Sequence, residues 1–115
     1  MKHILSALFL LLVSTAGTFA QDKIASLSVK TTFYCDHCKQ CGSCGERITE
    51  AVFTEKGIKR VDIDEKEMAI NVVYNTRKTD ADKIRKAIAA SGFDADELKA
   101  EPTAVAALDA CCKRK

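Results

Sequence analysis

Four evenly spaced cysteines organise this chain, in the stretch Cys-Asp-His-Cys-Lys-Gln-Cys-Gly-Ser-Cys at residues 35–44. The stretch follows a predicted strand and comes just before a predicted helix. Because the first turn of a helix brings positions i and i+3 to the same side, thiolates three residues apart at such a junction can converge on one soft ion. The spacing therefore favours a metal site that draws on Cys35, Cys38, Cys41 and Cys44.

The N-terminal residues have the pattern of a secretory signal. Lysine and histidine at positions 2 and 3 precede an apolar run at residues 4–13, and small residues follow up to Ala20. The run is roughly ten residues long, shorter than the ~20 that a membrane-spanning helix needs. We therefore expect a signal peptide at residues 1–20, a mature chain that begins near Gln21 without a membrane span, and a periplasmic or secreted location. An uncleaved N-terminal anchor is the alternative.

The rest of the chain has the size and charge of one small domain. About 95 residues remain, enough for a single modest core. Without the signal's lysine, 17 basic residues stand against 16 acidic ones, and no basic stripe is interleaved with aromatic residues. Nucleic acid is therefore not an expected partner. The sequence contains no internal repeat and no low-complexity linker, so we expect one domain and a tail.

Alternating apolar residues predict the strands. Residues 25–34 alternate as a half-buried strand does, and residues 58–64 and 68–74 alternate around a charged turn, which indicates an antiparallel hairpin. Residues 93–98 fit a short last strand. The side chains predicted to face inward are Leu27, Val29, Thr31 and Phe33, then Val61 and Ile63, then Met68, Ile70, Val72 and Tyr74.

Capping motifs and apolar stripes predict two helices. The S-x-x-E capping box at residues 43–46 predicts a helix with Cys44 at its first helical position, and Gly57 stops it. The motif Thr-x-x-Asp at residues 79–82 predicts the start of a second helix, which Gly92 ends. The side chains predicted to face inward are Ile48, Ala51 and Val52 of the first helix, and Ala81, Ile84, Ala87 and Ile88 of the second.

The predicted order of elements is β-α-β-β-α-β. Two helices packed on one face of a four-stranded antiparallel sheet satisfy this order, since every strand alternates and only one face of the sheet would be covered. We therefore predict an α+β, ferredoxin-like sandwich.

Three segments resemble a known family. Cys-Gly-Ser-Cys-Gly-Glu-Arg-Ile at residues 41–48 lies between the first strand and the first helix, and it is followed by Gly-Ile-Lys-Arg-Val-Asp-Ile at 57–63 and Ser-Gly-Phe-Asp-Ala at 91–95. Together they resemble the heavy-metal-associated domain family, which includes copper chaperones, metal-binding modules of metal-exporting ATPases and the periplasmic mercury-binding protein. The resemblance implies such a domain at residues 25–99 and leaves a cysteine-containing C-terminal tail at residues 100–115.

The resemblance also implies a site and a role. It implies that Cys41 and Cys44 are the two ligands of a soft ion, and that the protein passes this ion by ligand exchange to a partner. A membrane metal transporter or another metal-binding domain would be such a partner. In the family, methionine is common at the position of Lys39 and glycine at that of Cys38, so this loop departs from the usual motif.

Thiol chemistry supports the same site without the family. A cysteine binds metal as thiolate, and Cys44 at the positive end of a helix is expected to have a pKa below the free value of about 8.5. Two soft thiolates suit Cu(I) or Hg(II), whereas four, with Cys35 and Cys38 as secondary ligands, suit tetrahedral Zn(II) or Cd(II). His37 could replace one sulfur. We therefore predict Cu(I), Zn(II) or Hg(II) as the bound ion.

Two other classes of function compete with metal binding. Cys41 and Cys44 could form a structural disulfide or serve a thiol–disulfide oxidoreductase, although Pro102 is the one proline and lies in the tail, where it cannot act as a cis-proline companion. An iron–sulfur protein fits less well, because the last cysteine spacing is one residue short and Gly45 replaces the expected proline. No nucleophile–histidine–acid set can be assembled, so we do not expect an enzyme.

The roles of the remaining cysteines stay open on sequence alone. Cys35 and Cys38 could be metal ligands, a protective disulfide or a second redox pair. Cys111 and Cys112 are adjacent and precede a basic end. They could fold back onto the metal loop, or be an idle or oxidised tail.

Overall fold

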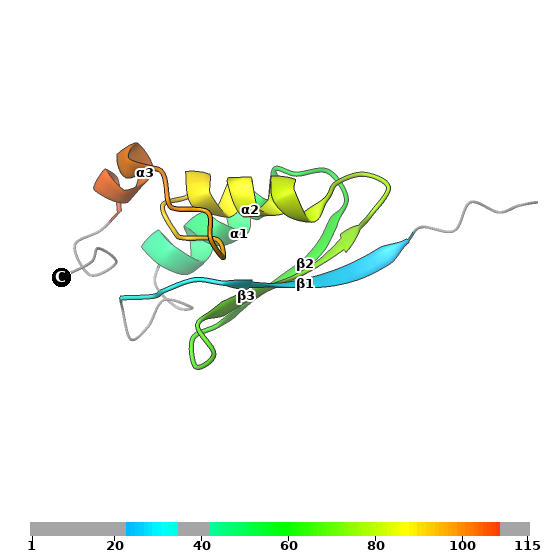
Figure 1. Ribbon diagram of the computed structural model, residues 1–115, viewed down its shortest axis with the longest axis horizontal. Coiled ribbons are helices and arrows are strands. Elements are labelled where there is room, and N and C mark those ends of the chain that lie inside the picture. The colour runs from blue at the N-terminus through cyan, green and yellow to red at the C-terminus, as the bar shows by residue number, and fades with distance from the viewer. Residues whose placement is uncertain (1–22, 35–41, 109–115) are drawn as a thin grey trace, which may run out of the picture.

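The computed structural model describes residues 23–34 and 42–108. Their strands form one antiparallel sheet with the spatial order β1-β3-β2 (Figure 1). In that sheet Leu27 lies opposite Val72, and Val72 lies opposite Val61, so apolar positions of all three strands share one face. The strands are β1 (Ile24–Lys30), β2 (Ile58–Asp64) and β3 (Ala69–Asn75).

The helices cover one face of this sheet and one of its ends. Figure 1 shows α1 and α2 side by side on the same face, and α3 at the end where β1 stops and α1 begins. A π-helical turn leads directly into α1. None of the described helices has the length and apolar character to cross a membrane. The elements are η1 (Gly42–Glu46), α1 (Arg47–Phe53), α2 (Ala81–Ala90) and α3 (Pro102–Ala106).

The predicted α+β, ferredoxin-like fold is confirmed. Its last strand is reduced: within the described residues, positions 93–98 make one isolated bridge, between Ala95 and Leu98. They still follow the free edge of β1, where Asp96 N–H donates to Lys30 O at 2.7 Å and Lys30 N–H donates to Asp96 Oδ1 at 2.8 Å. Asp96 has φ 54°, and a left-handed residue turns the chain away from an extended path.

Two strand boundaries differ from the prediction for local reasons. Met68 has φ 50° and is exposed, so it belongs to the turn, and the strand begins one residue later than predicted. Pairing of β1 ends at Lys30, opposite the first residue of β3. The predicted burial pattern nevertheless continues past that point, because Thr31 and Phe33 are buried. The bounds predicted for β2 are confirmed.

The second helix is capped one residue later than predicted. Asp80, with extended backbone, is the N-cap, and its carboxylate accepts a hydrogen bond from the Lys83 N–H at 2.9 Å. The predicted cap, Thr79, is buried, and its hydroxyl lies 3.4 Å from a carboxylate oxygen of Glu55. Tertiary contact therefore decides between two neighbouring residues that could both cap. Gly92 follows the helix with φ 104°, as its predicted role requires.

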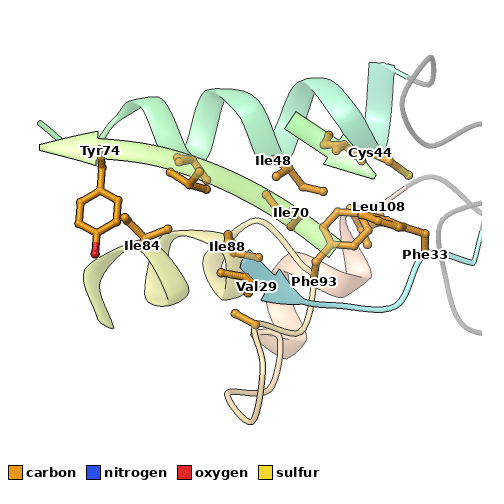
Figure 2. Packing of buried hydrophobic residues seen from close by; sticks show 14 residues of the cluster. Val29, Phe33, Cys44, Ile48, Ile70, Tyr74, Ile84, Ile88, Phe93 and Leu108 are labelled. Carbon is orange, nitrogen blue, oxygen red and sulfur yellow. The ribbon is translucent and has the colours of Figure 1, made fainter. Parts of the chain in front are cut away.

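The core lies between the sheet and the two helices. Figure 2 shows it extending from Tyr74 at one end to Cys44, Phe33 and Phe93 at the other. Burying one such aliphatic side chain is worth about 1.5–3 kcal/mol. The side chains with no exposed surface include Val29, Ile48, Val52, Ile70, Val72, Ile84 and Ile88, all predicted to face inward.

The chain beyond residue 99 adds a packed element that the sequence did not indicate. Leu108 is buried and joins the core cluster, and the Glu101 N–H donates to Ala89 O at 3.0 Å. Gly92 permits this close approach: a Cβ there would lie 3.1 Å from Leu108 Cδ1 and 3.2 Å from the Ala104 carbonyl. Packing therefore continues across the predicted boundary between domain and tail.

Candidate metal centre

Cys44 is the predicted ligand that the structure describes. It is the third residue of η1, has no exposed surface, and belongs to the same core cluster as Ile48 and Leu108. The other predicted or discussed residues, Cys35, His37, Cys38, Cys41, Cys111 and Cys112, lie outside the described residues, so their roles stay predictions. Among residues 23–34 and 42–108, no group of three or more His, Cys, Asp or Glu side chains gathers into a cluster that could hold a metal ion.

The predicted capping box at the start of α1 is wrong. Helical structure already begins at Gly42, so Ser43 lies inside it and cannot be the N-cap, and Cys44 is the third rather than the first helical residue. Glu46 has helical backbone, with φ −67° and ψ −44°, and makes no side-chain capping bond. The wider π turn accommodates an extra residue in the coil before the regular helix starts.

A side-chain hydrogen bond supports this irregular start. The Thr49 hydroxyl donates to the carbonyl of Gly45 at 2.7 Å, one turn earlier. Such a bond satisfies a carbonyl at the junction between the π turn and α1, where the regular backbone ladder changes register. Single π turns often occur at functional sites, and this one carries Cys44.

Cys44 is disulfide-bonded in the structure. Its partner is one of the other five cysteines, all outside the described residues. A disulfide sulfur does not titrate, so the lowered pKa expected for the Cys44 thiol applies to the reduced chain and stays a prediction. Ligation requires thiolate, and the structure therefore represents the oxidised form of a group that must be reduced before it can hold metal.

Aromatic residues close this end of the core. The rings of Phe33 and Phe93 are 6.0 Å apart with an interplanar angle of 56°, a tilted pair. The Phe33 N–H donates to the thioether of Met68 at 3.4 Å, which holds the segment that follows β1 against the hairpin turn. Figure 2 shows Phe33, Phe93, Leu108 and Cys44 gathered at this end. The chain thus enters residues 35–41 from a fixed position.

Arg47 links the start of α1 to the C-terminal segment. Its Nη2 donates to the carbonyl of Ala107 at 3.0 Å. Sequence analysis missed this residue and also Leu108, because neither belongs to an apolar stripe or a cysteine motif. Both lie next to the cysteine-bearing turn once the chain has folded.

An ionic network holds residues 93–98 against β1 and α2. Arg85 pairs with Asp96 at 2.8 Å and with Asp82 at 3.1 Å. Burial alone would raise the pKa of Asp96, but hydrogen bonds from Arg85 and from the Lys30 N–H, with both positive charges, outweigh burial and lower it below 3.8. The hydrogen bond from Arg85 to Asp96 in turn raises the pKa of Arg85.

Comparison with known proteins agrees with this fold. Oxidized MerP from Ralstonia metallidurans CH34 has a TM-score of 0.54 and 19% identity, over 64% of this chain and 96% of its own. The putative copper-ion-binding protein from Bacillus anthracis str. Ames has a TM-score of 0.55 and 18% identity, over 66% and 100% of the two chains. The CopZ metallochaperone has a TM-score of 0.51 and 19% identity, over 62% and 98%.

Sequence comparison identifies a similar family. No curated protein matches the chain significantly. The model of the heavy-metal-associated domain matches residues 39–94, a range that contains the η1 turn and both main helices. That domain is a metal-binding and non-enzymatic one. Over residues 39–94 the chain is therefore similar to the heavy-metal-associated domain family, and the solved structures above show the same fold.

Proposed function

We propose that this protein is an exported carrier, chaperone or scavenger of a soft metal ion, which it holds on the thiolates of Cys41 and Cys44. The observation that carries the proposal is the position of Cys44, in an irregular helical turn at one end of a heavy-metal-associated domain. Similar structures described as copper-ion-binding and as a metallochaperone support it. Cu(I), Hg(II) and Zn(II) are the candidate ions, because thiolate ligands favour soft or borderline metals.

Ligand exchange would follow from the same chemistry. Two thiolates supply two negative charges and two soft donors, which satisfy Cu(I) or Hg(II) and leave room for an incoming thiolate of a transporter or a second metal-binding domain. Cys35 and Cys38 are secondary ligands in this proposal, and their participation would shift the site towards tetrahedral Zn(II). The fold's part is to hold Cys44 on a packed turn while Cys41 precedes it by three residues.

Metal competition by thiol variants tests the proposal. We expect Cys41→Ser and Cys44→Ser to lower the affinity of the reduced chain for Cu(I) or Hg(II) by orders of magnitude, because a serine hydroxyl is a poor ligand for soft ions. Cys35→Ser and Cys38→Ser are the matched controls, with a smaller loss. Titration against a chromophoric chelator, without oxygen and with a reductant, measures all four. Unchanged affinity in both primary variants would contradict the proposal.

A thiol–disulfide oxidoreductase is the second candidate, and the disulfide at Cys44 is the observation that favours it. In that case a substrate thiolate attacks the disulfide, forms a mixed disulfide and releases one cysteine thiolate. Rapid catalytic exchange by a reduced chain that binds no soft ion would establish this function. Exchange no faster than that of a small dithiol, together with tight metal binding, would exclude it.

Export is proposed from the N-terminal pattern alone. Cleavage near Gln21 would release a chain with its cysteines outside the cytoplasm, where disulfides persist. Intact-mass measurement of protein from the native cell tests this directly. A mass that includes residues 1–20 would contradict it.

A further inference from the structure

We propose that two copies of this protein associate through the free edge of β1, so that their two sheets join into one. β1 of one copy pairs with β1 of the second copy in antiparallel orientation, with Ser26 opposite Ser26. The inference goes beyond the function proposed above, because the association needs neither a metal ion nor a cysteine.

The edge of β1 is open along most of its length. β1 is an outer strand of the sheet and pairs with β3 on one side. On its other side, residues 93–98, predicted as the fourth strand, bond to Lys30 through Asp96. Within residues 23–34 and 42–108, no other backbone bond crosses this edge. Beside residues 24–28 the described chain therefore supplies no fourth strand.

The backbone of this edge presents donors and acceptors at alternate residues. Lys30 exchanges its hydrogen bonds with Asp96 on the side away from β3. Since the direction of these groups alternates along a strand, the N–H and C=O groups of Ile24, Ser26 and Ser28 also point away from β3. Each of these three residues can therefore exchange two hydrogen bonds with a residue of an added antiparallel strand.

The apolar side of β1 is incompletely covered in the same region. Val29 is fully buried, whereas Leu27 and Ala25 are half-buried although both pack against the core. The residues opposite them on β3, Val72 and Tyr74, are buried. A strand added at this edge would cover the apolar surface that remains.

The two edges of the sheet differ in their protection against such pairing. The β2 edge has a register shift between Ile58 and Arg60, and Arg60 pairs with Asp62 at 2.6 Å. Bulges and charged side chains of this kind hinder the pairing of an edge with another chain. Between Lys23 and Lys30, β1 carries no charged residue and no proline. The β1 edge is therefore the one that can accept a strand.

The sequence of β1 fits its own edge, which is why a second copy is the proposed occupant. A strand bound there must place apolar side chains on the face that the helices cover and small polar ones on the open face. β1 does both, because Ala25 and Leu27 pack on the core while Ser26 and Ser28 are exposed. Centred on Ser26, the pairing places Leu27 beside Ala25 of the second copy. It uses residues 24–28 of both copies, the part of the edge that is free.

This arrangement keeps the two cysteine-bearing turns apart. β1 ends at the end of the sheet where α1 begins, and the η1 turn with Cys44 leads into α1 (Figure 1). Antiparallel pairing of two such strands therefore places the two Cys44 turns at opposite ends of the joined sheet. Association through a shared metal ion or an intermolecular disulfide would bring cysteines of the two copies together instead.

The first test measures association of the protein recovered from its native cell, with a reductant and a chelator present. The paired surface is short, so we expect a weak dimer that sedimentation equilibrium detects as the concentration rises. Amide hydrogen exchange at Ser26 and Ser28 should slow over the same range, because their N–H groups become bonded. A parent that stays monomeric up to millimolar concentration would overturn the proposal.

Charge substitutions at Ser26 test the register. Ser26→Lys and Ser26→Asp each place like charges opposite one another, so each variant alone should associate roughly fivefold more weakly than the parent. An equimolar mixture of the two should associate more strongly than either, because opposite charges then meet. Asn71→Lys is the matched control, since it adds the same charge to the same face but on the central strand, and it should leave association unchanged.

A proline at the same position tests the backbone bonds without adding charge. The N–H that Ser26→Pro removes points away from β3, so the bonds inside the sheet are kept, and proline is tolerated on an edge strand in that orientation. We expect association to weaken by about tenfold or more, because each copy loses a donor. A melting temperature close to that of the parent would show that the fold is intact.

Two further results would overturn the proposal. If Ser26→Lys, Ser26→Asp and Ser26→Pro all associate as the parent does, the contact between copies lies elsewhere. If the Ser26 and Ser28 amides are protected equally at every concentration, a segment of the same chain covers the edge. Weaker association of the three variants, with recovery in the mixture, would establish the β1 pairing.

Discussion

The two main helices begin in different ways. At α2, Asp80 has extended backbone and its carboxylate accepts from the Lys83 N–H, as a regular N-cap does. At α1, a π turn replaces the cap, and no side chain caps the helix. The start of α2 therefore follows local rules, and the start of α1, which directly follows the turn containing Cys44, departs from them. Departures of this kind are expected where function competes with regular structure.

The largest effect expected is the same at both helices. Ile48 of α1 and Ile84 of α2 have no exposed surface, so replacing either by alanine leaves a cavity and should lower the free energy of unfolding by about 2–5 kcal/mol. Urea unfolding of the oxidised chain measures both. A much smaller loss for Ile48→Ala would mean that α1, despite its burial, is packed less tightly than α2.

A smaller effect should distinguish the helix beginnings. Asp80→Ala removes the capping acceptor of α2 and should cost about 1 kcal/mol of stability. Glu46→Ala removes a carboxylate that makes no capping bond to α1 and should change stability by less than about 0.5 kcal/mol. Equal losses from the two substitutions, measured by the same unfolding experiment, would remove the contrast between the two helices.

The pH dependence of stability should come from Asp96, beside the edge strand β1, where it pairs with Arg85 of α2. The lowered pKa of Asp96 means that its contribution to stability is present above pH 3.8 and is lost as the pH falls through its folded pKa. Asp96→Asn should therefore be less stable than the parent at pH 7, by up to about 1 kcal/mol for this partly exposed pair.

The check on Asp96 is convergence at low pH. As pH falls below 3.8, the parent loses the ionised form and its melting temperature should approach that of Asp96→Asn. Asp82→Asn is the matched control, since Asp82 pairs with the same Arg85 on the exposed side of α2 and should have less effect. A constant difference between parent and Asp96→Asn over the whole pH range would contradict the assigned cause.

The sequence was sufficient to predict the elements and core residues whose local apolar pattern agrees with their burial in the fold. Alternation located β2 without error, and the apolar stripes identified Ile48, Val52, Ile84 and Ile88 as core residues. The capping-box pattern predicted the start of the first helix to within two residues, with Cys44 in its first turn, although the capping interaction itself is absent. These features depend on the periodic spacing of apolar residues along a strand or helix, which can be read directly from the sequence.

Sequence was insufficient where distant contacts decide the outcome. Thr79 and Asp80 can both cap a helix, and the contact of Thr79 with Glu55 selects Asp80. The helix α3 has five residues and no buried side chain of its own, so it carries no periodic pattern. Its position depends on the close approach of Ala104 and Leu108 to Gly92, and Leu108 joins the same core cluster as Cys44 although the two are distant in sequence.

The central proposal is that the thiolates of Cys41 and Cys44 hold a soft metal ion. Its most direct test is to titrate the reduced and the oxidised forms of the parent chain with Hg(II) or Cu(I) in parallel. Because Cys44 is disulfide-bonded in the structure, the account predicts tight, stoichiometric binding after reduction and no comparable binding in the oxidised chain. A reduced chain that binds no soft ion, or an oxidised chain that binds equally well, would contradict it.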